Sequence, residues 1–109
     1  MELVKYEDFA RLDIRAAKVT DARPIAGKTR IMEGRVDLGG GDERSVIIGG
    51  AQYHTPEDMI GRTVIVIANL EPKRVAGIES NAMLLAADVD DRPVWLTPSG
   101  EAPAGAPVK

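Results

Sequence analysis

Two adjacent cations, Lys73 and Arg74, stand in a polar stretch between two apolar runs at 64–68 and 83–87. The apolar runs predict buried strands, so the cations fall on the connection between them. An ammonium group pairs with anionic oxygens, and the planar guanidinium can donate two hydrogen bonds to one phosphate. The connection therefore suits an anionic ligand such as a nucleic-acid backbone. On its own, such a pair is more often an ordinary solvated surface feature.

Three uncharged side chains flank the cations. Asn69 and Ser80 offer hydrogen bonds to phosphate, sugar or base edges, and Met83 offers a flexible apolar surface. Each also has a structural alternative. An asparagine after a strand can close a turn, and a loop serine can bond the nearby backbone. Met83 begins a predicted strand, where a core position is the commoner one.

No other chemistry is suggested by the residue types. The chain has no cysteine and a single histidine, His54, so neither a disulfide nor a thiolate metal site can form. The glycine run at 39–41 lacks the helix and the Lys-Ser/Thr pair of a phosphate-binding loop, and a turn fits it better. No base and nucleophile are paired by spacing. We therefore expect no catalytic residue, no metal and no cofactor, and hence no enzyme.

The charge distribution is uneven. The net charge is -3, which argues against indiscriminate nucleic-acid binding by the whole surface. Residues 11–35 carry seven basic and three acidic residues, whereas the remainder carries seven basic and fourteen acidic ones. This asymmetry leaves room for a local basic face on an acidic body, although charge counting alone favours an ordinary solvated strand surface.

Hydrophobic periodicity predicts mainly strands, at 12–19, 31–38, 45–48, 64–68, 83–87 and 94–96. One short helix is predicted after Thr55, because Thr55 can cap, Pro56 suits the first helical position and Gly61 can end the helix. A second helix is expected at 6–10. The order predicts an all-β OB-fold, a five-stranded barrel with a short helix between strands 3 and 4. In that fold the loop after strand 4 borders the nucleic-acid face.

The whole chain, 1–109, is expected to form a single domain, with an N-terminal segment at 1–10 and a C-terminal extension at 98–109. The extension is rich in proline and glycine and predicts irregular, extended backbone. No apolar run is long enough to cross a bilayer, and the first residues lack the features of a secretory signal. We therefore expect a cytoplasmic protein with no membrane partner.

Two stretches resemble a known family. The segment FARLDIR at 9–15 is similar to the opening motif DFxKxDLRV of the tRNA-binding domain family, and VIANLEPKRVAGIESNAM at 66–83 resembles its signature VANLxPrkixGxxSxgM. This OB-fold domain occurs at the C-terminus of methionyl-tRNA synthetase, as free-standing relatives and as a bacterial export chaperone. The resemblance implies tRNA contacts at Asn69, Lys73, Arg74, Ser80 and Met83.

The resemblance also implies a function and partners. We expect structure-selective tRNA binding by a trans-acting or appended module of methionyl-tRNA synthetase, and alternatively a chaperone for unfolded polypeptides. Free-standing relatives resemble homodimers joined through both terminal segments, and the apolar residues Leu3, Val4, Tyr6 and Phe9 agree with a homodimer. Gly49 and Gly50 stand where many relatives have serines. The few aromatic residues favour recognition of RNA shape over base stacking.

Overall fold

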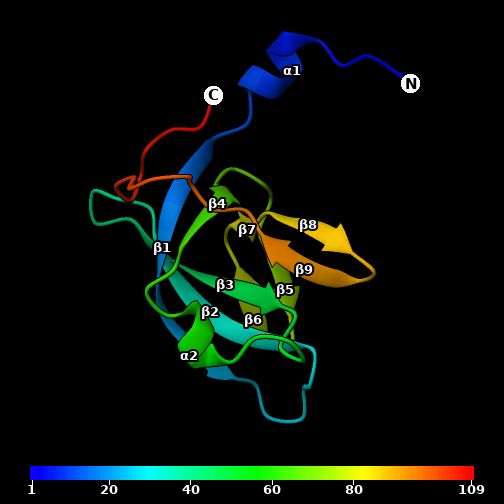
Figure 1. Cartoon of the computed structure of the whole chain (residues 1–109), viewed down its shortest axis with the longest axis vertical. Helices are drawn as coiled ribbons and strands as arrows, with labels where there is room; N and C mark the ends of the chain where they lie inside the picture. The colour runs from blue at the N-terminus through cyan, green and yellow to red at the C-terminus, as the bar shows by residue number, and fades with distance from the viewer.

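The computed structural model describes residues 1–109 and is dominated by one antiparallel sheet. Five strands in the order β3-β2-β1-β4-β7 curl into a nearly closed barrel (Figure 1). These strands are β1 (Ile14–Pro24), β2 (Ile31–Asp37), β3 (Glu43–Gly49), β4 (Thr63–Ile67) and β7 (Met83–Leu84). Two short hairpins complete the structure: β5 (Lys73–Val75) with β6 (Ile78–Ser80), and β8 (Ala86–Val89) with β9 (Arg92–Trp95). The predicted five-stranded OB-like barrel is confirmed.

The long strand β1 makes the barrel curl. Its first half pairs with β4 and its second half with β2, and the register shifts between Val19 and Asp21. An extra residue at such a bulge bends the strand and increases its twist. One strand can therefore belong to both sides of a small barrel.

The core is built by alternation along the central strands. Inward-facing residues are fully buried at every second position, as at Val64 and Val66 of β4 or Val46 and Ile48 of β3. Gly34 faces the same interior, and the Ile48 side chain occupies the space in which its Cβ would lie. Each fully buried aliphatic side chain stabilises the fold by about 1.5–3 kcal/mol.

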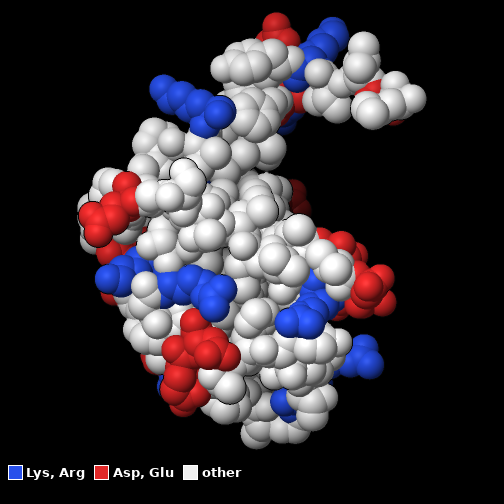
Figure 2. Space-filling view, viewed as in Figure 1, with Lys and Arg blue, Asp and Glu red and all other residues white.

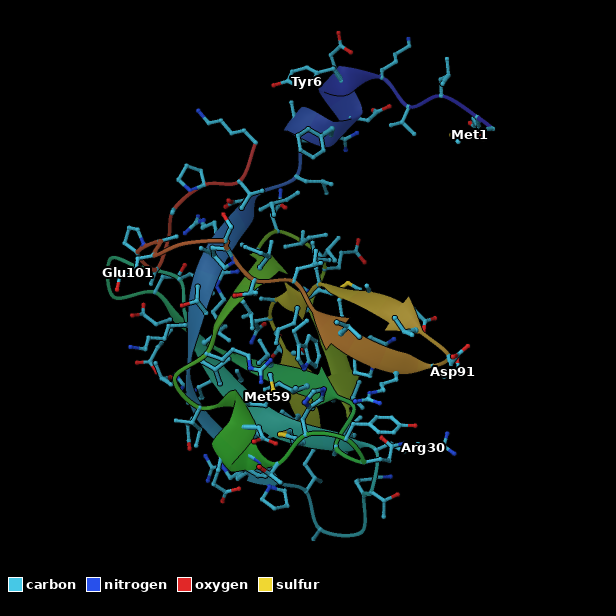
Figure 3. All side chains as sticks on the ribbon, in the orientation of Figure 1. Met1, Tyr6, Arg30, Met59, Asp91 and Glu101 are labelled. Atoms are coloured by element: carbon cyan, nitrogen blue, oxygen red, sulfur yellow. The ribbon has the colours of Figure 1, made fainter.

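Helix α2 (Pro56–Met59) lies between β3 and β4, as predicted. The Thr55 hydroxyl accepts from the Asp58 backbone, and the Asp58 carboxylate accepts from the Thr55 backbone, which forms a capping box. Met59 is completely buried between α2 and the strands (Figure 3). The helix therefore covers one end of the barrel with a single large side chain.

The two chain termini lie at the same end of the molecule (Figure 1). Helix α1 (Tyr6–Ala10) has no buried residue and stands away from the barrel, as Tyr6 shows in Figure 3. The C-terminal extension runs along the first part of β1, where Val108 N donates to Ile14 O and Ala16 N donates to Ala106 O, at 2.8 and 2.9 Å. The extension is irregular, as expected, but backbone hydrogen bonds fix it in place.

The prediction of one buried strand at 83–87 is wrong. The chain leaves the barrel after Leu85, whose N–H donates to Ile65 O of β4 at 2.8 Å, and every residue of β8 is exposed. β8 and β9 are joined by Asp90 and Asp91, both with positive φ, and form a hairpin that projects from the barrel (Figure 1). An apolar run can thus be divided between two sheets at a residue, here Leu85, that its composition does not mark.

Candidate nucleic-acid interface

The connection that carries the two cations is itself a hairpin, β5–β6. Its turn residues, Ala76 and Gly77, have φ of 52° and 78°, the conformation that two-residue hairpin turns require. Successive strand residues point to opposite faces. Lys73 accordingly lines a groove on one face together with Val75, whereas Arg74 is absent from that lining and donates to Gly77 O at 3.0 Å. The two adjacent cations therefore lie on opposite sides of the hairpin.

Both cations are exposed, and neither forms an ion pair with a carboxylate. The basic residues of the stretch 11–35 differ in this respect, since four of the seven pair with acidic neighbours. These pairs are Arg11–Asp8 at 3.9 Å, Arg15–Asp13 at 2.7 Å, Arg23–Asp21 at 3.7 Å and Arg35–Glu43 at 3.5 Å. Figure 2 shows basic and acidic groups side by side on the barrel. The positive charge of that stretch is thus partly compensated, since Lys18, Lys28 and Arg30 form no ion pair.

Asn69 joins the start of the connection to the segment before β1. Its Oδ1 accepts from the Asp13 backbone and its Nδ2 donates to Arg11 O, both at 2.7 Å. The residue is exposed, yet both ends of the amide hold backbone more than fifty residues away in sequence. The side chain thus has a structural role, although a long-range one and not the closing of a turn, and the amide keeps one free N–H for a ligand.

Ser80 joins the end of the hairpin to β3. Its hydroxyl accepts from Ile47 N at 3.0 Å and donates to Ala82 O at 3.2 Å. The next residue, Asn81, donates its backbone N–H to Ser45 O at 2.9 Å. These bonds cover the edge of β3 and close the gap between β3 and β7.

Arg44, which the sequence analysis did not single out, fastens both ends of the connection. Its guanidinium donates to Ala68 O and to Asn81 O, the carbonyls that precede and follow residues 69–80. Asp42 accepts two further hydrogen bonds from the same guanidinium, at 3.0 and 2.9 Å. These bonds lower the pKa of the Asp42 carboxyl below its usual value. Arg44 is thus oriented by one carboxylate and holds two carbonyls together.

An apolar groove of about 340 Å³ opens beside the hairpin. Met83 lines it and is 52% exposed, so this side chain does not take the core position that is commoner at a strand start. Trp95, from β9, also lines the groove and packs against the core. Its indole N–H is buried without an acceptor in the protein. Trp95 is a second residue of this face that the sequence analysis did not assign to it.

Other kinds of site are not evident. No group of three histidine, cysteine, aspartate or glutamate side chains could hold a metal ion. No helix combines the length and the apolar character that crossing a bilayer would require.

His54 is close to the ring of Trp95, with 6.0 Å between ring centroids, and its Nε2 lies 3.3 Å from Pro93 O. The histidine therefore contacts the β9 strand.

Comparison with known proteins agrees with this geometry. A family model described as "Putative tRNA binding domain" matches residues 14–107. The chain is 40% identical over 109 residues to the methionine–tRNA ligase of Pyrococcus horikoshii, covering all of this chain and 15% of the ligase. The curated relatives that it matches are far longer, and the chain spans 12 to 17% of their length.

Two solved structures have the same fold over nearly the whole chain. The MetRS-related protein of Pyrococcus horikoshii superposes with a TM-score of 0.91 at 31% identity and full coverage of both chains. The chaperone CsaA of Bacillus anthracis superposes with a TM-score of 0.89 at 28% identity, covering 99% of this chain and 100% of that one. With the match to the family model, these likenesses show that the chain belongs to the tRNA-binding domain family, as its sequence motifs indicated.

Proposed function

We propose that this chain binds tRNA on the face formed by the β5–β6 hairpin and the groove beside it. The observation that carries the proposal is the state of Lys73 and Arg74: both are exposed, and no carboxylate pairs with either. An unpaired surface cation is available to phosphate, whereas a paired one must first give up its partner. Membership of the tRNA-binding domain family supports the same ligand.

The five expected site residues take different roles in this proposal. Lys73 and Arg74 pair with phosphates on the two sides of the hairpin, and Met83 contacts a base or a ribose from the groove. Asn69 and Ser80 fix the two ends of the connection through their hydrogen bonds to backbone. Their contribution to affinity is then mainly to keep the cations in place before the ligand arrives.

Mobility-shift titration with total tRNA tests the proposal. With about four phosphates neutralised, the affinity of the unaltered chain should fall by about two orders of magnitude between roughly 50 and 200 mM salt. The double substitution Lys73→Ala with Arg74→Ala should weaken binding and reduce the salt slope by about 1 for each cation removed.

A charge-matched control separates a specific face from net charge. Arg11→Ala with Arg23→Ala also removes two positive charges from side chains that are 82% and 61% exposed, but each of these is already paired with a carboxylate. This control should bind tRNA nearly as well as the unaltered chain. An equal loss in both double variants would mean that only overall charge matters and that the assigned face is wrong.

We also propose that the chain contributes binding and no catalysis, acting as a trans-acting or appended module of methionyl-tRNA synthetase in the cytoplasm. The matched region is a small part of the ligases to which it is similar, and the family that describes it is named for binding. Aminoacylation rates of a methionyl-tRNA synthetase, measured with and without this chain at limiting tRNA, test the relation. A synthetase partner predicts a lower KM for tRNA at unchanged kcat.

A homodimer is the assembly that we propose. Leu3, Val4 and Tyr6 are 87, 73 and 73% exposed, which is a high exposure for neighbouring apolar side chains. Beside them, α1 and the C-terminal extension enclose a second groove of about 290 Å³, lined by Tyr6, Phe9 and Val108 among others. A second copy would cover this surface. Light scattering at micromolar concentration should report twice the chain mass, and a monomer there would contradict the proposal.

The groove beside the β5–β6 hairpin also supports a second candidate function, the binding of unfolded polypeptide. Its apolar lining could hold a hydrophobic side chain, and one structural neighbour is named a chaperone. Suppression of aggregation of a denatured protein, insensitive to salt and to added tRNA, would favour this function. Suppression that tRNA abolishes would instead indicate that the two ligands share one face.

A further inference from the structure

The groove beside the hairpin has walls from strands that are far apart in the sequence. Ile47 comes from β3, Val75 from β5, Met83 from β7 and Trp95 from β9, and together they make the lining mainly apolar. Lys73 is the only cation in the lining. A phosphate backbone alone needs the cation but does not need an apolar cavity beside it. The groove therefore indicates a ligand with a flat apolar part close to an anionic part.

We propose that this groove holds one unstacked nucleobase of the bound RNA, with an adjoining phosphate on Lys73. This inference rests on the tRNA binding proposed above and specifies which part of the RNA the same face binds. Proteins recognise unpaired RNA bases by stacking them on aromatic side chains and by contacting their edges. Trp95 is the only tryptophan of the chain, and it lies in this lining. The scarcity of aromatic residues thus does not prevent base recognition at one position.

The charges of the lining favour a nucleotide over a purely apolar occupant. Glu71 is the only carboxylate among the lining residues, and it repels an anionic group that would enter the groove itself. The phosphate is then held at Lys73 while the neutral base enters. A carboxylate also accepts a hydrogen bond from an exocyclic amino group, as cytosine N4 provides. Glu71 can therefore accept a hydrogen bond from a donor on the edge of the bound base.

Gly49 allows the groove to be filled without disturbing the barrel. It lies two residues after Ile47 on β3, so a side chain at this position points to the same face as Ile47. A Cβ added there has no heavy atom within 4 Å, and the backbone φ of Gly49 is outside the positive range. Gly49→Leu should therefore fold normally and occupy the groove. Gly100→Leu is the matched control, because Gly100 has the same free space and lies outside this groove.

The experiment reads the fluorescence of Trp95 in the full chain. The probes are total tRNA, a single-stranded oligoribonucleotide of mixed sequence and a blunt RNA duplex without unpaired nucleotides. We expect tRNA and the single strand to change the emission of Trp95 saturably, and the duplex to leave it unchanged. Gly49→Leu should bind the single strand and tRNA about tenfold more weakly, with an unchanged salt slope. Gly100→Leu should behave as the unaltered chain.

The possible outcomes separate this inference from the proposed function. If tRNA binds but Trp95 emission stays constant and Gly49→Leu keeps full affinity, no base enters the groove, although tRNA binding stands. If tRNA does not bind the unaltered chain at all, both proposals fail. If a denatured polypeptide changes the emission and the oligoribonucleotide does not, the groove holds apolar side chains of protein instead.

A second pair of variants covers the case in which Gly49→Leu does not fold. Met83→Ala removes a groove side chain that is 52% exposed, and Val89→Ala removes one that is 50% exposed on β8, outside the groove. Such exposed side chains contribute little to stability, so both variants should fold. Weaker single-strand binding by Met83→Ala alone supports the proposal, and equal binding by both variants contradicts it.

Discussion

Replacing Arg44 by methionine should detach the two ends of the connection that carries the cations. The substitution keeps an unbranched chain of comparable length but removes every donor. Ala68 O and Asn81 O would lose the guanidinium, and Asp42 would lose its only ion-pair partner. The expected result is a less stable barrel with a loosened β5–β6 hairpin.

The magnitude follows from the two carbonyl bonds. A hydrogen bond from a charged donor contributes about 1.5–3 kcal/mol, so two such bonds set an upper limit near 6 kcal/mol. The Arg44 side chain is 25% exposed, and water can reach part of the space that it leaves. We therefore expect a loss of about 2–3 kcal/mol in the free energy of unfolding. In urea this corresponds to a midpoint lowered by about 1–2 M.

Urea unfolding followed by far-UV circular dichroism measures this loss, and Arg23→Met is the matched control. Arg23 is 61% exposed, and its two ion pairs have N–O distances of 3.7 and 3.5 Å. Exposed pairs of this kind contribute at most about 1 kcal/mol, so the control should lose much less. A loss below about 0.5 kcal/mol for Arg44→Met would refute the reasoning, because water would then satisfy the two carbonyls as well as the guanidinium does. Weaker tRNA binding should accompany the instability, because the β5–β6 hairpin would no longer be fixed in its binding position before tRNA arrives.

Three further predictions concern other parts of the fold. Thr55→Ala removes one side of the capping box of α2 and should cost about 1 kcal/mol in urea unfolding, whereas a Thr55→Ser variant should lose much less. Gly105→Ala should destabilise by about 2 kcal/mol or more in thermal denaturation, because Gly105 has φ +93° and an added Cβ would lie 2.5 Å from Leu38 O; unchanged stability would mean that the extension is not held there. A hydrogen bond from an arginine side chain lowers the pKa of Asp13 below 3.8, so the stability from this carboxylate is complete above about pH 4 and is lost as the pH falls through the lower folded pKa. Unfolding at about pH 5 and pH 2.5 should show that loss in the unaltered chain and a smaller one in Asp13→Asn.

The main architecture could be predicted because its signals are local. Alternation marks the central strands, and the Thr55 cap with Pro56 and Gly61 marks the single helix of the barrel. The β5–β6 hairpin was missed because its strands have three residues each and its turn begins with Ala76, which adopts positive φ without being glycine or asparagine. The run at 83–87 was misread because composition does not show where a strand leaves a sheet.

The residues that carry charge at the site could be predicted only in part. Lys73 and Arg74 were identified by type and by family motif. The compensation of the basic stretch has a sequence signal that was not used: an aspartate and an arginine two residues apart in extended backbone lie on the same side, as at Asp13 and Arg15. The same spacing sets Asp42 beside Arg44. The carbonyls that Arg44 holds are 24 and 37 residues away in the chain, however, and only the folded barrel brings them together.

Helix α1 has a consequence for how the protein responds to dilution. It contains five residues, its first residue has no side-chain cap and none of its residues is buried. A helix this short is marginal in water, so its order must come from whatever packs against it. If a second copy supplies that packing, the N-terminal segment at 1–10 becomes helical when the dimer forms and loses its helix when the dimer dissociates. Amide hydrogen exchange in this segment should then slow as protein concentration rises, while exchange in β1 stays constant.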